Sequence, residues 1–347
     1  MSSLTTDLLI VGGGPAGLTC ALVFARLARP AILYDSGLYR NAQSKEAHTI
    51  PGYDGKSPAD WRRDVVAEIQ ASYPWVTIRR GQIDKIHKSE SGIFEASAAD
   101  GASLRARKVV LATGIQDNLP DVPGVAKIWG TKALHCIFCH GTETRFSPLA
   151  FLLDAKKPRF NSMVVASSLS LWPSLRHPAT YYLTDGLDIA DEGQLVKSGL
   201  QSELRVIKAN GSIIITEKIS RIEDTSDGLL VHFENHREPL AVGHVAVMPN
   251  SWSPNPHSRA FLDEALLSRP LSPDGSIVPA ESKDLEGRGT LPPLMGDEPR
   301  TATRGLFWAG NSGSFMGNVI NAISQGQMSA VMAGKELGDE DLAQARQ

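Results

Sequence analysis

Cysteine is scarce in this chain, which contains three among 347 residues. Two of them lie in the motif His135-Cys136-Ile137-Phe138-Cys139-His140, and the third is Cys20. The Cys-x-x-Cys spacing fits a redox dithiol, half of a zinc site or, with the histidine that follows, attachment of a c-type haem. Structural zinc needs four ligands, usually from two such pairs. The chain lacks a second pair, so we expect no metal centre.

Strong net charge and long apolar runs are also missing. The net charge is -3 with both signs mixed, which argues against nucleic acid or an anionic membrane as a partner. No apolar run is long enough to span a bilayer. The N-terminus has Asp7, several glycines and no basic stretch, which is not the pattern of a signal peptide. We therefore expect a cytoplasmic protein, in which haem attachment is disfavoured and thiols stay reduced unless they are catalytic.

The N-terminal part of the chain has the pattern of a dinucleotide-binding unit. Residues 7–11 predict a buried strand, 18–27 a packed helix and 31–34 a second strand that ends at Asp35. The segment Gly12-Gly13-Gly14-Pro15-Ala16-Gly17 joins the first strand to the helix, and Asp35 follows roughly 20 residues later, as in a dinucleotide-binding fingerprint. The chain is also longer than a single core usually becomes, so we expect two domains.

Each position in the glycine segment has its own role. Gly12 allows the tight turn, Gly14 lets the backbone approach a pyrophosphate, and Gly17 lets the helix pack on the strand. Pro15, followed by Ala16, suits the first helical turn, where its missing N–H costs nothing. The Asp35 carboxylate would then bind ribose hydroxyls.

Short alternating strands follow a predicted helix at 61–72. They cover residues 76–86, 93–98 and 103–107, and the next strand, 108–112, ends in Ala112-Thr113-Gly114. A meander inserted into a dinucleotide fold and followed by Ala-Thr-Gly indicates FAD rather than NAD in this first domain.

A second pass of the same plan begins after a connector at 118–130 that contains proline and glycine. Its predicted strands are 163–166, 179–184, 211–222, 229–234 and 245–248. The order of elements, rather than residue identity, suggests two related units. We therefore expect an α/β fold with two Rossmann-like, three-layer ββα nucleotide-binding domains. The FAD domain is discontinuous (1–130 and 251–347), and the domain at 131–250 carries the cysteine motif.

The second unit lacks the residues that bind a nicotinamide dinucleotide. Where a glycine fingerprint should follow 163–166, the chain reads Ser167-Ser168-Leu169-Ser170-Leu171-Trp172-Pro173, and Trp172-Pro173 should stop a helix early. The next predicted strand is followed by Asp185, whereas a 2′-phosphate would need arginines. We expect no working NADPH pocket.

The last segment returns the chain to the FAD domain. Strands are predicted at 276–279 and at 306–311, the second of which ends in Gly310-Asn311. A helix at 318–333 follows, and its N-terminus could face the electron-rich pyrimidine end of a flavin. The charged tail from Gly338 is expected to fray.

Together these motifs resemble the low-molecular-weight thioredoxin reductase family. Within it, the chain looks most like the fungal FAD-dependent dithiol oxidases that close disulfides in epipolythiodioxopiperazine (gliotoxin-type) natural products. The resemblance covers nearly the full length. It rests on Gly12 to Gly17, the run Asp35-Ser36-Gly37-Leu38-Tyr39-Arg40-Asn41, His48, Ala112-Thr113-Gly114, Cys136 to Cys139 and Gly310. The FAD-binding residues it implies, beyond the glycine segment and Asp35, are Ser36, Arg40, Asn41, His48, Ala112, Thr113, Gly310, Asn311, Asn318 and Val319.

Two positions differ from the reductase pattern. Reductases of this kind have an aspartate after the second cysteine, whereas this chain has His140, as the dithiol oxidases do. The family usually has Gly-Asp at the late FAD-binding strand. Asn311 stands there in this chain and could still hydrogen-bond the ribityl chain, without charge.

The resemblance implies thiol–disulfide exchange at the cysteine pair. A substrate thiolate would attack Cys136, and Cys139, the sulfur beside the flavin, would pass the electrons to FAD. Oxygen would reoxidise the flavin and be released as hydrogen peroxide. A histidine pKa near 6.5 suits proton exchange with thiols, and His140 is favoured over His135 for that role.

Several alternatives stay open. The cysteines could be a buried packing pair, the protein could be an NADPH-dependent disulfide reductase, or it could be a flavin-binding redox sensor without turnover. His48 could touch FAD or merely cap its loop. We expect a small-molecule dithiol and O2 as partners, no nucleic acid or membrane, and a homodimer by family resemblance.

Overall fold

The computed structural model describes residues 4–154, 158–171, 179–258, 261–262, 267, 299–313 and 317–347. The chain divides into two compact units. The first unit comprises residues 1–42, 49–117 and 252–347, and the second comprises 43–48 and 118–251. The sequence predicted boundaries at 130/131 and 250/251. It did not indicate that the short segment 43–48 is part of the second unit.

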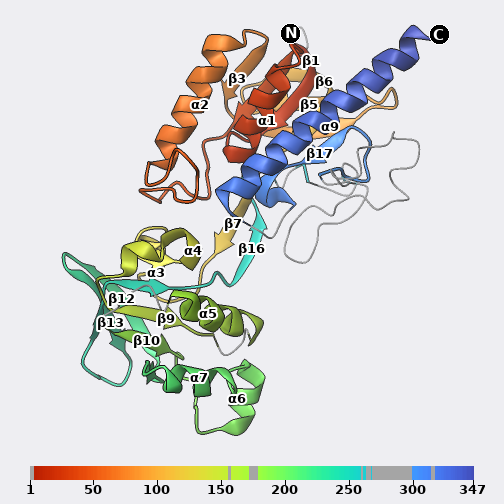
Figure 1. Cartoon of the computed structure of the whole chain (residues 1–347). Coiled ribbons are helices and arrows are strands. Elements are labelled where there is room, and N and C mark those ends of the chain that lie inside the picture. The colour runs from red at the N-terminus through yellow and green to blue at the C-terminus, as the bar shows by residue number, and fades with distance from the viewer. Residues whose placement is uncertain are drawn as a thin grey trace. The chain divides into compact units, whose positions relative to one another are not determined.

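The first unit is built on a parallel sheet with an antiparallel extension (Figure 1). Its parallel strands, in spatial order, are β3 (Val76–Arg80), β2 (Ala31–Asp35), β1 (Leu4–Val11), β6 (Ser103–Leu111) and β17 (Leu306–Trp308). The antiparallel strands β5 (Phe94–Ala98) and β4 (Ile83–Lys88) extend the sheet from the first half of β6. The two strands predicted at 103–107 and 108–112 are therefore one strand. It pairs with β1 along one edge, and on its other edge the first half pairs with β5 and the second half with β17.

The first unit has three layers, and successive side chains of β1 alternate between the two outer ones. Leu8 and Ile10 face the helices α1 (Pro15–Ala25), α2 (Pro58–Ser72) and α9 (Val319–Ala345), and Leu9 and Val11 face the meander of β4 and β5. Leu8, Leu9 and Ile10 are fully buried. Each such side chain contributes about 1.5–3 kcal/mol relative to exposure to water. This burial on both faces explains why the strand reads as a continuous apolar run.

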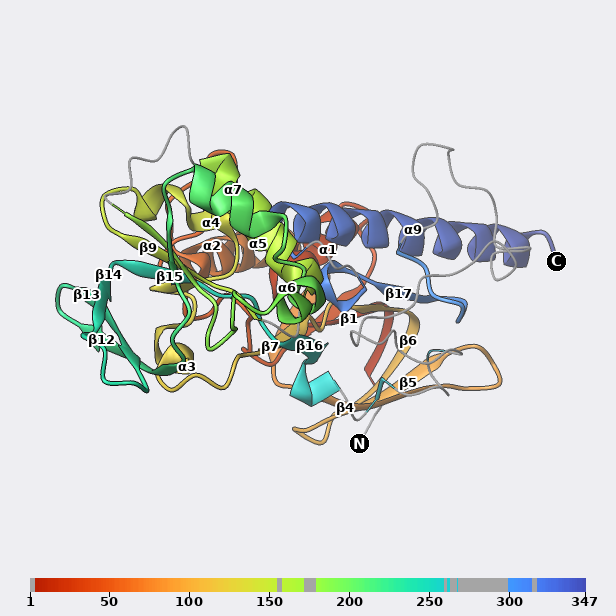
Figure 2. The same cartoon turned by 90° about the horizontal axis from the view of Figure 1, so that it is seen from below.

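Helix α9 is longer than the sequence predicted, and the prediction of a frayed tail from Gly338 is wrong. The helix runs to Ala345, and its N-terminal part packs against α1 (Figures 1 and 2). A Cβ at Gly326 would collide with the backbone of Ala16, so glycine is needed where the two helices meet. Acidic residues of the last turns then pair with basic residues of the sheet, which holds the helix end in place.

The second unit repeats the plan of the first. Its parallel sheet has the spatial order β11 (Ile213–Ile215), β10 (Thr180–Leu183), β9 (Leu149–Leu152), β15 (His244–Ala246) and β8 (Ala133–Leu134). An antiparallel meander consists of β12 (Ile219–Thr225), β13 (Gly228–Phe233) and β14 (Leu240–Val242). Leu149 and Phe151 pack with residues of the helices, and Ala150 and Leu152 pack with the meander. Both units therefore have the expected three-layer ββα architecture.

The strand predicted at 163–166 is wrong, because these residues lie within the helix α5 (Pro158–Leu171). The first strand of the second unit is β9, which lies earlier in the chain. Among residues 161–171 of α5, the buried ones are Asn161, Val165 and Ser168, and their spacing is that of one helix face. The valine pair at 164–165 suggests a strand by local propensity, but packing of that face on the sheet decides the outcome.

The remaining elements are short. They are β7 (Ile115–Asn118), α3 (Val125–Ile128), α4 (Ile137–His140), the 3-10 turn Thr142–Thr144, α6 (Glu192–Ser198), α7 (Glu203–Ala209), β16 (Ser251–Pro254) and the 3-10 turns Pro256–Ser258 and Gly310–Ser312. The predicted strand at 276–279 and the helix stop at Trp172-Pro173 lie outside the described residues. Within the described ranges, no helix has both the length and the apolar character needed to cross a membrane.

Candidate active site

The glycine turn of the first unit connects β1 to α1. Gly12 has φ +118°, and a Cβ there would collide with the carbonyl of Ala112 at the end of β6. A Cβ at Gly17 would collide with the carbonyl of Gly12, so the turn closes tightly on the first helical turn. Pro15 occupies the first turn of α1, as predicted, and Gly14 is the N-cap. This segment therefore folds as the glycine pattern requires.

Gly14 is the position that fits a cofactor. A Cβ built on Gly14 meets no atom within 4 Å, so its hydrogen faces open space beside the N-terminus of α1. No side chain caps this helix end, and its first turn contains no acidic residue. Free backbone N–H groups and the positive end of the helix are the features that bind a pyrophosphate. The residues present fit the diphosphate of FAD at this turn.

Asp35 lies at the end of β2 and is held by neighbouring donors. Its Oδ1 accepts a hydrogen bond from the Gly37 N–H at 2.9 Å, and its Oδ2 accepts from the Tyr39 hydroxyl at 2.5 Å and from Arg80 Nη1 at 2.7 Å. Burial and the Asp35 carboxylate raise the pKa of Tyr39, which keeps its hydroxyl a donor. Ser36 accepts a hydrogen bond from the backbone of Leu38. The carboxylate is thus oriented at the strand end where a ribose is expected.

Arg40 and Asn41 each have a protein partner. The guanidinium of Arg40 makes a bidentate pair with Asp117, with Nε–Oδ2 and Nη2–Oδ1 distances of 2.9 and 2.6 Å. Trp252 donates from Nε1 to the same carboxylate at 2.8 Å. The Asn41 carbonyl oxygen accepts from Arg62 Nη1 at 3.1 Å. Both predicted residues therefore have fixed orientations.

The Ala-Thr-Gly segment after β6 is fixed by Ser312. The Gly114 N–H donates to Ser312 Oγ at 2.9 Å, and Thr113 Oγ1 lies 3.2 Å from the same oxygen. Gly310 has φ +71°, and a Cβ there would lie 3.0 Å from the Cβ of Ala16. The structure thus brings together the predicted residues of three distant segments, the glycine turn, Ala112-Thr113-Gly114 and Gly310.

The side chains of Arg40 and Asn311 both lie against Gly317. A Cβ on Gly317 would collide with Arg40 Nη1 and lie 2.7 Å from Asn311 Nδ2. The next residue, Asn318, is the N-cap of α9, and its Oδ1 accepts from the Asn321 N–H at 2.8 Å. Val319 begins the helix. Two residues predicted separately, Arg40 and Asn311, are therefore neighbours across the same glycine.

In the second unit, Cys136 and Cys139 form a disulfide, with their Cα atoms 5.2 Å apart. Cys136 is the N-cap of α4, and its carbonyl accepts from the N–H groups of Cys139 and His140, both at 3.2 Å. Between the cysteines, Ile137 is buried in the core of the second unit. One short turn anchored by a core side chain therefore presents both sulfurs.

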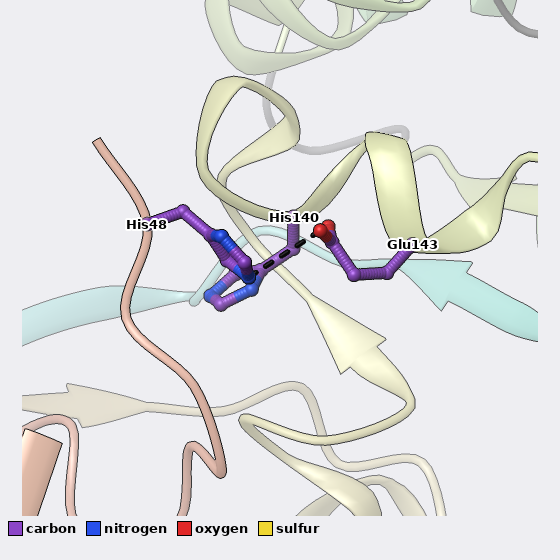
Figure 3. Close-up of side chains that lie close together, drawn as sticks. All are labelled: His48, His140 and Glu143. Carbon is purple, nitrogen blue, oxygen red and sulfur yellow. Dashed lines mark ion pairs between the residues drawn. The ribbon is translucent and has the colours of Figure 1, made fainter. Parts of the chain in front are cut away.

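His140 lies at the end of α4 beside His48 and Glu143 (Figure 3). The rings of His48 and His140 meet edge to face, with their centroids 5.8 Å apart. His48 Nε2 lies 3.3 Å from Glu143 Oε1 and 3.5 Å from Glu46 Oε2. Burial, and then His48, lower the pKa of His140, and the carboxylates of Glu143 and Glu46 oppose them. His140 is therefore a partly buried histidine whose neutral form is favoured, as a proton acceptor requires.

The structure separates residues that the sequence grouped. His135 stacks on Trp129, with ring centroids 5.4 Å apart, rather than joining His140. His48, predicted to bind FAD, belongs to the second unit through the segment 43–48 and meets His140. The sequence did not predict Glu143, Asp117 and Ser312, which are single polar residues outside any motif. Only their partners in the folded chain identify them.

An FAD-type unit, with a redox-active cysteine pair in a second unit of the same plan, defines the class of flavin-dependent disulfide oxidoreductases. A model of the pyridine nucleotide-disulphide oxidoreductase family matches residues 6–148. The chain is 31% identical over 342 residues to thioredoxin reductase tcpT of Claviceps purpurea, covering 97% of this chain and 95% of that protein. The chain therefore belongs to the thioredoxin reductase family. Proteins of this family bind FAD, so both the family resemblance and the predicted cofactor are confirmed.

Further comparisons agree. Thioredoxin reductase sirT of Leptosphaeria maculans is 27% identical over 328 residues, covering 92% of this chain and 90% of its own length. The crystal structure of HlmI superposes with a TM-score of 0.78 at 26% identity, covering 99% of this chain and 97% of that one. A putative thioredoxin reductase TrxB from Bacillus anthracis gives a TM-score of 0.79 at 22% identity, with 97% and 99% covered. The predicted fold class is confirmed.

Proposed function

We propose that this protein is an FAD-dependent dithiol oxidase. It closes a disulfide in a small-molecule natural-product dithiol and uses O2 as the electron acceptor, with H2O2 as the product. The observation that carries the proposal is the Cys136–Cys139 disulfide beside His140, in a unit whose sequence has no glycine between β9 and α5. A cytoplasmic location belongs to this proposal, and so does a homodimer, which the family resemblance implies.

Thiol–disulfide exchange transfers two electrons from the substrate to the cysteine pair. A substrate thiolate attacks Cys136 Sγ, a mixed disulfide forms, and Cys139 leaves as a thiolate. The second substrate thiol, once deprotonated, attacks the substrate sulfur of the mixed disulfide and displaces Cys136. The substrate is then oxidised to its disulfide, both cysteines are reduced, and two protons have been released.

His140 is the proposed proton acceptor in this exchange. Its imidazole follows Cys139 directly, and its lowered pKa favours the neutral ring, which can accept a thiol proton. His48 packs edge to face against that ring and pairs with Glu143. His135 is the less favoured candidate because its ring stacks on Trp129.

Transfer of electrons from the cysteine pair to oxygen requires the cofactor. When bound, FAD would accept the two electrons of the reduced cysteine pair and deliver them to O2, which is released as H2O2. In this chain, Gly14 and the N-terminus of α1 would hold the pyrophosphate, and Asp35 the ribose. The Arg40, Thr113 and Asn311 side chains would line the rest of the binding site.

The sequence after β9 supports an oxidase rather than an NADPH-dependent enzyme. Between β9 and α5 the chain reads Leu153-Asp154-Ala155-Lys156-Lys157-Pro158, without glycine. The glycine fingerprint was expected after 163–166, which proved to be helical, but it is also missing after the strand that is present. The Asp154 N–H donates to Asn161 Oδ1 at 3.0 Å, which occupies a donor that a pyrophosphate would need. After β10, the Asp185 Oδ1 accepts from the Ile219 N–H at 2.8 Å, where a 2′-phosphate would need a cation.

An NADPH-dependent disulfide reductase is the second candidate. The names of the relatives favour it, since tcpT and sirT are both called thioredoxin reductases. This candidate requires rapid reduction of the flavin by NADPH.

One anaerobic titration separates the candidates. The FAD-loaded protein is mixed with either a model dithiol or NADPH, and flavin bleaching is recorded. Bleaching by the dithiol alone supports the oxidase, and rapid bleaching by micromolar NADPH would establish the reductase. Bleaching by neither would indicate a redox sensor. In air, the oxidase should consume O2 and release peroxide in proportion to dithiol loss, whether or not NADP⁺ is present.

A further inference from the structure

Two imidazoles and a carboxylate converge beside the cysteine pair. His48 comes from the segment 43–48, His140 ends α4, and Glu143 lies in the 3-10 turn Thr142–Thr144. One possible ligand atom from each side chain lies within 4.8 Å of the other two. Figure 3 shows the three side chains pointing toward one another from these separate backbone segments.

The spacing suits a small divalent transition metal ion. Zinc bonds to histidine nitrogen and carboxylate oxygen are about 2.0–2.2 Å long, so neighbouring ligand atoms in a tetrahedral site lie about 3.3–3.5 Å apart. His48 Nε2 and Glu143 Oε1 are already separated by 3.3 Å. Small rotations of partly exposed side chains would bring the His140 nitrogen to the same distance.

The donor set also suits zinc. Two histidines and one glutamate, with water in the fourth position, form a known type of open zinc site. Glu46 is a possible fourth ligand, because its Oε2 lies 3.5 Å from His48 Nε2 and its side chain is 55% exposed. The cysteines are joined in a disulfide and supply no thiolate.

We propose that His48, His140 and Glu143 form a binding site for a divalent transition metal ion such as Zn²⁺. The bound ion would occupy the imidazole nitrogen of His140 that faces this cluster. Zinc would therefore inhibit dithiol oxidation reversibly. The inhibition rests on the proposed function, whereas the binding does not.

A histidine–glutamate pair alone does not make such a site, and the chain contains a matched control. His232 Nε2 lies 2.9 Å from Glu223 Oε2 on the strands β13 and β12, without a second imidazole in the described surroundings. The two pairs have the same chemistry and similar separations. Only the pair beside His140 has the third ligand.

Equilibrium dialysis of the oxidised, FAD-loaded protein against ZnCl2, with bound zinc measured by elemental analysis, tests the site. We expect one saturable equivalent per chain. His48→Ala and Glu143→Gln should each weaken binding at least about tenfold, while His232→Ala should leave it unchanged. Far-UV circular dichroism checks that each variant is folded. No saturable binding, or equal binding by all four proteins, would overturn the proposal.

Two further measurements distinguish this site from others. Binding of Co²⁺ should produce visible d–d bands without the thiolate charge-transfer bands of a cysteine-ligated ion. A metal that binds only after the disulfide is reduced would contradict the proposed ligands. Zinc should also inhibit dithiol turnover of the wild type, with reversal by EDTA. An absence of dithiol turnover in metal-free enzyme would count against the proposed function and leave the dialysis result valid.

Discussion

The ammonium group of Lys108 lies 2.5 Å from Glu340 Oε1, which joins the centre of the first sheet to the last turns of α9. The Lys108 side chain is only 3% exposed. A lysine buried to this degree needs an acidic partner, because an unpaired charge in the interior is strongly destabilising. This pair therefore helps to hold the last turns of α9 on the sheet, together with the pair between Arg107 and Asp341.

We expect Glu340→Gln to lower the free energy of unfolding at neutral pH by about 1.5–3 kcal/mol, the range for a hydrogen bond to a charged group. Burial raises the pKa of Glu340, but hydrogen bonds from Lys108 and Arg107 outweigh it, so the pKa is lowered from its ordinary value of 4.5. A lowered acid pKa stabilises the fold above the unfolded value, and this stability is lost as the pH falls through the folded value.

Urea unfolding at several pH values tests this expectation. The difference between wild type and Glu340→Gln should be full above about pH 4.5 and shrink below it. Asp339→Asn is the matched control, since Asp339 pairs with Lys335 on the exposed side of α9. It should cost no more than about 0.5 kcal/mol. A difference that grows as the pH falls would contradict the assignment.

Gly14→Val should remove the flavin while leaving the fold intact. The valine side chain would fill the open space beside the N-terminus of α1, where the pyrophosphate is expected. We expect FAD affinity to fall by about tenfold or more, at least about 1.4 kcal/mol. The measurement is the flavin absorbance of the purified protein per chain. Gly338→Val, another glycine with open space around it, should keep the wild-type flavin content.

Gly317→Ala should weaken FAD binding through its neighbours rather than through direct contact. The new methyl group would displace the Arg40 guanidinium and the Asn311 amide. Such overpacking costs about 1–3 kcal/mol in general. Fluorescence titration of the apoprotein with FAD measures the loss. Wild-type affinity in a folded Gly317→Ala protein would show that neither side chain contributes to binding.

Cys136→Ser and Cys139→Ser should both lose turnover but differ in their spectra. The exchange mechanism assigns attack by substrate to Cys136 and electron transfer to FAD to Cys139. Only Cys136→Ser should therefore retain a long-wavelength thiolate-to-flavin absorption band. Cys20→Ala removes the buried free cysteine and should retain turnover. A band that survives in Cys139→Ser instead would reverse the two roles.

Much of the first unit could be predicted because its information is local. The glycine segment, Pro15 and the strand that ends at Asp35 determine the β1–α1–β2 turn from backbone requirements alone. The Cys-x-x-Cys pair is equally local, since two intervening residues place both sulfurs on one short turn. The distal glycines are different. The need for glycine at Gly326 and Gly317 arises only from Ala16 and from Arg40 and Asn311, which lie far away in the sequence.

The errors have the same origin. The valines at 164–165 favour a strand locally, yet tertiary packing places them in α5. The charged residues of the tail predict fraying, yet ion pairs with Lys108 and Arg107 hold the tail on the sheet.

The sequence by itself therefore determined the flavoprotein class and the redox pair, because backbone turns and adjacent residues encode them. Only the tertiary structure decided which histidine meets which carboxylate. His48 and Glu143 are separated by roughly 95 residues and belong to no shared motif. Their contact depends on the segment 43–48, which belongs to the second unit although the residues on both sides of it belong to the first. No local sequence pattern predicts this assignment.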